Sequence, residues 1–506
     1  MSTDVPADIK SKASMMDADT ISANEEAQHT LYLDPKEEAK VVRKLDIFLT
    51  PVLFIVYLSC FIDRANIGNV KVAGMPEAIG ASEFQYSIAV SIFFITYIVI
   101  EIPCVILVKR FTPRYILTFL CLVWTGATIA NGFITNVGGL YACRLALGAA
   151  EGGLFPSLNM YLTLVYKRDE MARRVSYLVS CVALSGAIGG LLAYGLLQMD
   201  GIGGYPGWRS VTTFLARLYG GHADNSLLRW VYIIEGAFSL VCAFGIWFGL
   251  PSDVRQSYFL DEKERKIMEI RHQQRMSYMG EDVFSWEEIR LAATDVKVWL
   301  CAGTQFFQNI LSNGFGTFLP AILHAMGHDR LSANYLTIPV YVLGAIGFFT
   351  FAFLSDKYQK CGPFILFTNS LGGIGYILLI AVKNNAVKYF ATFVCTIAVY
   401  NGTGLNLAWL NVNMAPQYRR ATAIGIQQTI GNSAGIIAGQ VYRKSPYMLG
   451  HDFSLGSIVV ANVLVSIHLA YLLRSNKEKA AILAGERPDN RKKTTGDRNL
   501  EFKYRP

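Results

Sequence analysis

The sequence predicts an all-α membrane protein with twelve transmembrane helices arranged as two six-helix halves. Of its 506 residues, 52% are hydrophobic and only 17% are charged, a balance too apolar for the surface of a soluble protein. The apolar residues form many runs close to the roughly 20 residues that a bilayer core requires. A charged stretch in the middle of the chain separates these runs into two sets of six.

The N-terminal half, residues 45–250, holds six apolar runs. They predict helices near residues 45–66, 84–108, 115–135, 138–162, 174–198 and 230–250. The C-terminal half, residues 298–473, predicts six more, near residues 298–323, 335–354, 363–382, 388–411, 421–442 and 453–473. Two halves of this kind form an internal repeat, which is typical of secondary transporters that bind solutes between the halves.

Three polar segments complete the chain: a tail at residues 1–44, a linker at 251–297 and a second tail at 474–506. An even number of helices places both termini on one side of the membrane. Basic residues are more frequent in the loops of that side, and Lys40, Arg43 and Lys44 precede the first helix. The positive-inside rule therefore predicts cytoplasmic tails and a cytoplasmic linker, with the plasma membrane as the expected location.

Composition argues against several other functions. The nine cysteines lie almost wholly in apolar runs without metal-binding or disulfide spacing, so buried thiols are expected. The net charge of +8 is dispersed over loops and tails, which predicts no nucleic-acid partner. The chain has no P-loop, no aspartyl-phosphate sequence and no convergent nucleophile, base and acid. We therefore expect neither a pump nor an enzyme, and no cofactor or metal.

Four charged residues fall inside predicted helices as two pairs, Asp63 with Arg64 and Arg144 with Glu151. A charge at the bilayer centre costs about 3 kcal/mol or more, so each needs a partner or a water-filled cavity. Seven residues are two helical turns, which puts Arg144 and Glu151 on one face. A carboxylate that can lose an arginine partner can take up a proton, so these residues could couple transport to protons. The alternative is mutual neutralisation that only fixes helix packing.

The C-terminal half offers amides in place of charges. The candidates for contacting a polar solute are Gln305, Asn309 and Asn313 in the seventh helix, Asn406 in the tenth, and Gln428 and Asn432 in the eleventh. Their spacing of four residues aligns them in stripes. Hydrogen bonding between helices is the competing interpretation. Two further acids, Glu101 and Glu235, are expected to be interfacial or structural.

Several strings resemble a known family. Residues 61–68, Phe-Ile-Asp-Arg-Ala-Asn-Ile-Gly, and residues 144–156, which include Arg-Leu-Ala-Leu-Gly and Glu-Gly-Gly-Leu-Phe-Pro, are similar to its signatures in helices 1 and 4. Residues 33–46 resemble its pre-helix segment, and residues 355–358 resemble its loop motif after helix 8. The family is the major facilitator superfamily, and more narrowly the fungal allantoate permease group of the anion:cation symporters.

The resemblance implies a monomeric carrier in the lipid bilayer that takes up a small organic anion of the vitamin, carboxylate or ureide class. It implies proton symport with alternating access. Carried over by position, Asp63 and Glu151 are implied to be proton-coupling sites, Arg64 to contact the substrate anion, and Arg144 to partner Asp63. Efflux of a secondary metabolite and nutrient sensing without transport remain alternatives.

One segment departs from the family pattern. The group reads Gly-Trp-Arg-Trp continuously into helix 6, whereas here residues 209–228 separate Gly207-Trp208 from Arg229-Trp230. Deleting this segment restores the pattern in register, so we hypothesise a retained intron or a mispredicted gene boundary. Sequencing the transcripts tests this, and messages that contain the segment throughout would contradict it.

Overall fold

The computed structural model describes residues 33–72, 74–198, 226–279, 286–415, 417–489, 496–500 and 502–506. Every regular element in these ranges is a helix. The helices of the N-terminal half are α2 (Pro35–Phe48), α3 (Thr50–Val72), α4 (Met75–Ala78), α5 (Glu83–Arg110), α6 (Pro113–Asn131), α7 (Val137–Gly152), α8 (Leu154–Val165), α9 (Arg168–Gln198) and α11 (Ser226–Gly249). Of the hypothesised insertion, residues 209–225 lie outside the described residues, and 226–228 begin α11.

The linker and the C-terminal half are also helical. The linker holds η2 (Val254–Gln256), α12 (Glu262–Met279) and α13 (Trp286–Ala293). The C-terminal half holds α14 (Val296–Ala325), α15 (Arg330–Tyr335), α16 (Thr337–Tyr358), α17 (Gly362–Ala381), α18 (Asn385–Val412), α19 (Gln417–Val441) and α20 (Met448–Leu483), and a short η3 (Gly496–Arg498) follows.

Eight helical stretches in the described part of the chain are long and apolar enough to cross a membrane. They cover all of α3, α6, α16, α17, α18 and α20 and most of α5 and α11. Helices also lie at the other four predicted positions, where α7 with α8, α9, α14 and α19 are found. Arg144 and Glu151 lie on α7, and most of the predicted amides lie on α14 and α19. The structure thus confirms a multi-pass helical protein, while the number of twelve spans stays a prediction.

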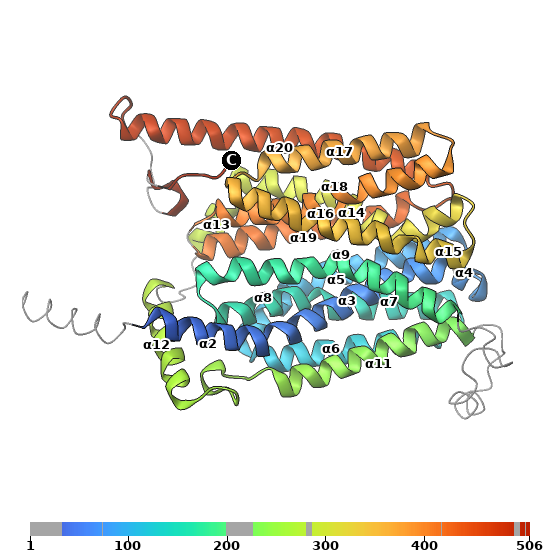
Figure 1. Ribbon diagram of the computed structural model, residues 1–506, viewed down its shortest axis with the longest axis horizontal. Coiled ribbons are helices and arrows are strands. Elements are labelled where there is room, and N and C mark those ends of the chain that lie inside the picture. The colour runs from blue at the N-terminus through green and yellow to red at the C-terminus, as the bar shows by residue number, and fades with distance from the viewer. Residues whose placement is uncertain are drawn as a thin grey trace, which may run out of the picture.

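The helices run roughly along the long axis of the molecule in two adjoining groups (Figure 1). In the N-terminal group α5 packs on α7, α6 on α11 and α3 on α9, and in the C-terminal group α14 packs on α19 and α17 on α18. The groups contact each other through α5 with α19, α9 with α16 and α3 with α14. Figure 1 shows α2 and α12 at one end of the molecule and α4 and α15 at the other.

Two sets of contacts join the groups towards the α4 and α15 end, and we call them the outer contacts. A Cβ atom on Gly68 of α3 would lie 1.8 Å from the carbonyl oxygen of Thr317 in α14, so the two backbones touch. The Ser91 hydroxyl of α5 donates to the Ile436 carbonyl of α19 at 2.8 Å and accepts from Gln440 Nε2 at 2.9 Å. The two groups are therefore closely apposed at this end.

The helix predicted at residues 138–162 is instead two helices, α7 and α8, which meet at Gly153. Pro156 lies in the first turn of α8, where its missing N–H and its ring disfavour a continuous helix. A Cβ atom at Gly153 would lie 2.3 Å from Cys104 Sγ, so the turn also packs closely on α5. The break follows directly after Glu151, one of the predicted site residues.

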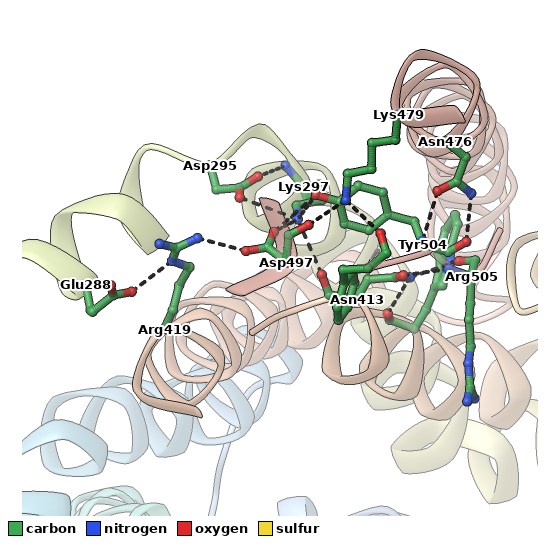
Figure 2. A network of polar contacts seen from close by, with 12 residues as sticks. Glu288, Asp295, Lys297, Asn413, Arg419, Asn476, Lys479, Asp497, Tyr504 and Arg505 are labelled. Carbon is green, nitrogen blue, oxygen red and sulfur yellow. Dashed lines mark hydrogen bonds and ion pairs between the residues drawn. The ribbon is translucent and has the colours of Figure 1, made fainter. Parts of the chain in front are cut away.

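The segment after α20 folds back onto the ends of α14, α18 and α19 (Figure 2). Fully buried Asp497 forms ion pairs with Lys297 and, at 2.8 Å, with Arg419. Lys479 of α20 donates to the Asp497 carbonyl at 2.7 Å, and Asp295 caps α14 beside Lys297. We call these five residues the tail cluster. Their burial shows that part of the predicted polar tail packs on the helices.

Candidate functional site

The Asp63 side chain is enclosed by neutral donors. Its Oδ2 atom accepts from Trp124 Nε1 at 2.5 Å, from Ser239 Oγ at 3.1 Å and from Thr128 Oγ1 at 3.3 Å. These donors come from α6 and α11, which pack on each other beside α3. The Oδ1 atom has no hydrogen-bond partner in the described structure. Asp63 is thus held in place by one oxygen, and the other oxygen remains open for a donor.

Arg64 and Glu151 form an ion pair between α3 and α7. Arg64 Nη2 and Nε donate to Glu151 Oε2 at 3.0 and 3.1 Å, and Cys60 Sγ donates to the same oxygen at 3.2 Å. Glu151 Oε1 has no hydrogen-bond partner among the residues described. The pair therefore leaves one buried carboxylate oxygen unused.

Aromatic rings surround the Arg64 guanidinium group. Its Cζ atom lies 4.7 Å from the ring centre of Phe61, 5.1 Å from that of Phe93 and 5.0 Å from that of Tyr97. Ring faces attract cations, and the attraction increases where water is excluded. These rings hold the charge of Arg64 beside Glu151.

Arg144 is only 2% exposed, and its Nε and Nη2 atoms have no hydrogen-bond partner in the described part of the chain. It lies close to Tyr232 and Glu235 of α11. The expected pairing of Arg144 with Asp63 is not found among the described ion pairs. Neutral donors occupy Asp63 Oδ2 instead, and Asp63 Oδ1 has no donor in the described structure. Arg144 therefore has free N–H groups buried in the N-terminal half.

Glu235, which the sequence predicts to be interfacial or structural, is also a member of this cluster. It is 3% exposed, accepts from Asn66 Nδ2 at 2.7 Å and faces the Asp63 carboxyl group at hydrogen-bonding range. Two local signals existed, because Asn66 follows Asp63 by three residues and Ser239 follows Glu235 by four, which puts each pair on one helix face. We call Asp63, Arg64, Arg144, Glu151 and Glu235 the membrane cluster.

Some of the predicted amides bind one another. Asn406 is fully buried and donates through Nδ2 to Gln305 Oε1 at 2.8 Å and to the Cys301 carbonyl at 2.9 Å. Gln305 Nε2 reaches Asn309 Oδ1 at 3.5 Å. These bonds match the alternative of hydrogen bonding between helices for Gln305 and Asn406. Contact of either residue with a substrate stays a prediction.

Among the remaining amides, Asn432 contacts the N-terminal half. Asn313 on α14 and Gln428 and Asn432 on α19 are half-buried. Asn432 hydrogen-bonds to Glu101 of α5, so this amide spans the boundary between the two groups. Glu101 in turn is close enough to Arg64 for an electrostatic interaction. The α19 stripe and the membrane cluster thus approach the same boundary from opposite sides.

A pocket of about 270 Å³ lies elsewhere, at the α2 and α12 end of the N-terminal half. Its lining includes Lys167, Arg255 and Arg271, which could suggest an anion site. Each of these cations already pairs with a carboxylate, as when Arg255 binds Asp253 at 2.9 Å. Hydrogen bonds from Arg255 hold the pKa of Asp253 below its ordinary value. The pocket therefore offers no free positive charge comparable to that of Arg144.

The helical architecture and the buried charges define a multi-pass membrane transporter. Residues 53–439 match the family model of the Major Facilitator Superfamily. The chain belongs to the Major Facilitator Superfamily.

Relatives and solved structures agree with this assignment. The chain is 43% identical to an uncharacterized transporter of Schizosaccharomyces pombe, covering 93% of this chain and 94% of that protein. It is 31% identical to the high-affinity nicotinic acid transporter of Saccharomyces cerevisiae, covering 92% of this chain and 85% of that protein. A bacterial homolog of the human lysosomal transporter Spinster, in an inward-facing conformation, shares the fold with a TM-score of 0.62 at 16% identity, covering 84% of this chain and 95% of that chain.

Proposed function

We propose that this protein is a secondary active transporter that moves a small organic anion by proton symport with alternating access. The membrane cluster carries the proposal, because it holds three buried carboxyl groups with one buried guanidinium group, Arg144, and one partly buried guanidinium group, Arg64, and so has one negative charge in excess. A buried excess charge of this kind favours uptake of a proton. The unpartnered Arg144 nitrogens offer donors to a carboxylate.

In this proposal the twelve predicted helices form two halves that rock about a site at their boundary. Arg64 and Arg144 bind the anion, Asp63 and Glu151 exchange protons, and the half-buried amides Asn313, Gln428 and Asn432 contact the polar part of the solute. The outer contacts support an arrangement closed at the α4 and α15 end. Uptake across the plasma membrane is the expected direction.

The nicotinic acid transporter among the relatives supports a carboxylate of the vitamin class as the substrate. A planar carboxylate is well suited to guanidinium groups, which can donate two parallel hydrogen bonds to it. Other vitamins, ureides and dicarboxylates share this carboxylate chemistry and belong in the test panel.

The test is uptake of radiolabelled nicotinate, pantothenate, biotin, allantoate and dicarboxylates into cells that lack their own carriers. Expression of the protein is expected to cause accumulation that rises with external acidity and disappears with a protonophore. Accumulation that is independent of pH would contradict symport. Reduced steady-state label would indicate efflux, and the absence of any flux for every compound would favour a nutrient sensor.

Glu151→Gln provides the first variant for this assay. It removes the ionisable group but keeps its size and one oxygen acceptor for Arg64. Uphill accumulation is expected to disappear while exchange of internal for external substrate continues, because exchange needs no net proton movement. Gradient-driven uptake that is unchanged from the wild type would remove Glu151 from the proton pathway.

A further inference from the structure

Glu235 and Asp63 place two buried carboxyl groups face to face. Glu235 Oε2 accepts from Asn66 Nδ2 at 2.7 Å, and its carboxyl group lies at hydrogen-bonding range of Asp63. Asp63 Oδ2 already has three donors, whereas Oδ1 has none in the described chain. The two acids thus lie close together, and Asp63 has one oxygen that lacks a donor.

Two ionised carboxylates cannot satisfy each other, because both are acceptors only. Like charges at this separation also repel strongly where water is excluded, so two carboxyl groups that share a site tend to hold one proton between them. A single proton on the pair supplies the missing donor and removes one buried charge. The geometry therefore favours a pair that carries one proton and one negative charge.

The charged and polar groups that face the pair come from four helices. They are Asn66 of α3, Trp124 and Thr128 of α6, Arg144 and Glu151 of α7, and Tyr232 and Ser239 of α11. Arg144 is the one cation in this set, and it forms no ion pair with either acid among the described residues. Its positive charge nevertheless acts on Glu235.

We propose that Glu235 shares the transported proton with Asp63, and that Arg144 links this proton to the bound anion. The inference rests on the proposed symport and adds a residue to it. While Arg144 is free, its field favours loss of the proton from the pair. An anion bound to Arg144 cancels that field, so the pair holds its proton more tightly. Because this coupling is reciprocal, protonation of the pair then increases the affinity of Arg144 for the anion.

Glu235→Gln tests the proposal, because the amide keeps a hydrogen-bond donor beside Asp63 but cannot release a proton. With one proton per anion, a pH gradient of one unit supports roughly tenfold accumulation of substrate. In Glu235→Gln this accumulation ratio is expected to fall to about one, with exchange of internal for external substrate retained. Glu235→Asp, which keeps a carboxyl group, is expected to recover part of the accumulation.

The matched control is Glu83→Gln, which removes a glutamate from exposed α5 surface outside the membrane cluster. It is expected to accumulate substrate like the wild type. A Glu235→Gln protein that accumulates substrate as the control does would overturn the proposal.

Infrared spectroscopy of the purified protein tests the shared proton without any transport. The wild type at neutral pH is expected to show the carbonyl band of a protonated carboxyl group that weakens in Glu235→Gln and in Asp63→Asn but persists in Glu83→Gln. A spectrum in which neither substitution changes the band would overturn the shared proton even if symport occurs. A band that behaves as expected in a protein without proton-dependent flux would instead refute the proposed symport.

Discussion

The tail cluster and the membrane cluster are both buried, yet their hydrogen bonding differs. In the tail cluster the two Asp497 carboxylate oxygens each receive a cation, Lys297 on one and Arg419 on the other. In the membrane cluster, Asp63 Oδ1, Glu151 Oε1 and two nitrogens of Arg144 have no partner in the described structure. One network is nearly saturated, and the other retains unused donors and acceptors.

The tail cluster and the membrane cluster also differ in their balance of positive and negative charges. Asp295 and Asp497 of the tail cluster, together with Glu288 on Arg419, match the charges of Lys297, Arg419 and Lys479. The membrane cluster has one carboxyl group more than it has guanidinium groups. A balanced and bonded network stabilises a single structure, whereas an unbalanced one has capacity for a proton and an anion. The clusters should therefore respond to substitution in different ways.

The largest loss of stability is expected from Asp497→Ala. It leaves Lys297 and Arg419 buried without their shared counter-charge, and breaking a buried ion pair in this way costs about 3–5 kcal/mol. Thermal unfolding of the purified protein measures the loss. Asp452→Ala, at an exposed position of α20, is the control and should change the free energy of unfolding by less than about 0.5 kcal/mol. Equal stability of the two variants would contradict the account of the tail cluster.

Arg144→Ala should separate binding from stability. Hydrogen bonds to a charged ligand are worth about 1.5–3 kcal/mol each, so anion affinity is expected to fall by at least about tenfold. Stability should change less than in Arg419→Ala, because two Arg144 nitrogens have no bonds to lose. Substrate binding and thermal unfolding, measured on the same samples, check both parts. A larger loss of stability for Arg144→Ala than for Arg419→Ala would contradict the difference inferred between the two clusters.

Gly68→Ala probes the outer contacts. A Cβ atom 1.8 Å from the Thr317 carbonyl oxygen forces α3 and α14 apart, and overpacking of this kind typically costs about 1–3 kcal/mol. Thiol labelling of a cysteine placed near Ser91 should increase as the halves separate. In Gly245→Ala the added carbon meets nothing within 4 Å, so that variant should leave labelling unchanged. Similar labelling in both variants would count against contact between the backbones.

The smallest loss of stability is expected at the partly exposed pair of Asp253 and Arg255. This pair provides a reference for the two buried clusters. Arg255 lowers the pKa of Asp253 in the folded protein. The pair's contribution to the free energy of unfolding is therefore present above the unfolded pKa of about 3.9 and is lost as the pH falls below that value. Arg255→Ala should remove at most about 1 kcal/mol near neutral pH. The free energies of unfolding of the wild type and of Arg255→Ala, measured between pH 3 and 7, test this. A difference between them that stays constant across that range would exclude a contribution from Asp253.

The apolar runs predicted where the helices lie, because the length and composition of a span are local properties of the chain. The sequence does not predict the break at Gly153, because Pro156 lies within one continuous apolar run. Asp63, Arg64, Arg144 and Glu151 were identified because charges in apolar runs are conspicuous. How they pair was not predictable, because it depends on neighbours from α6 and α11 that sequence spacing cannot place.

Glu235 and Asp497 show two further limits. The sequence predicts Glu235 to be interfacial or structural, because its partners Asp63 and Asn66 lie about 170 positions away in the chain and cannot be inferred from local spacing. Asp497 lies in a polar and charged segment, whose composition predicts exposure. It is buried only because the ends of α14 and α19 bring Lys297 and Arg419 together beside it.

The chemical nature of the outer contacts bears on how readily they break. They consist of a glycine backbone against a carbonyl oxygen and of hydrogen bonds from hydroxyl and amide groups. Such contacts are worth about 0.5–1.5 kcal/mol each, and apolar residues of both groups, such as Val70 and Phe318, pack in one hydrophobic cluster in addition. A ligand moves a two-state population from almost wholly closed to almost wholly open with about 5.5 kcal/mol of differential affinity. Opening this end in the proposed transport cycle therefore has to separate apolar surfaces of the two groups as well as the outer contacts.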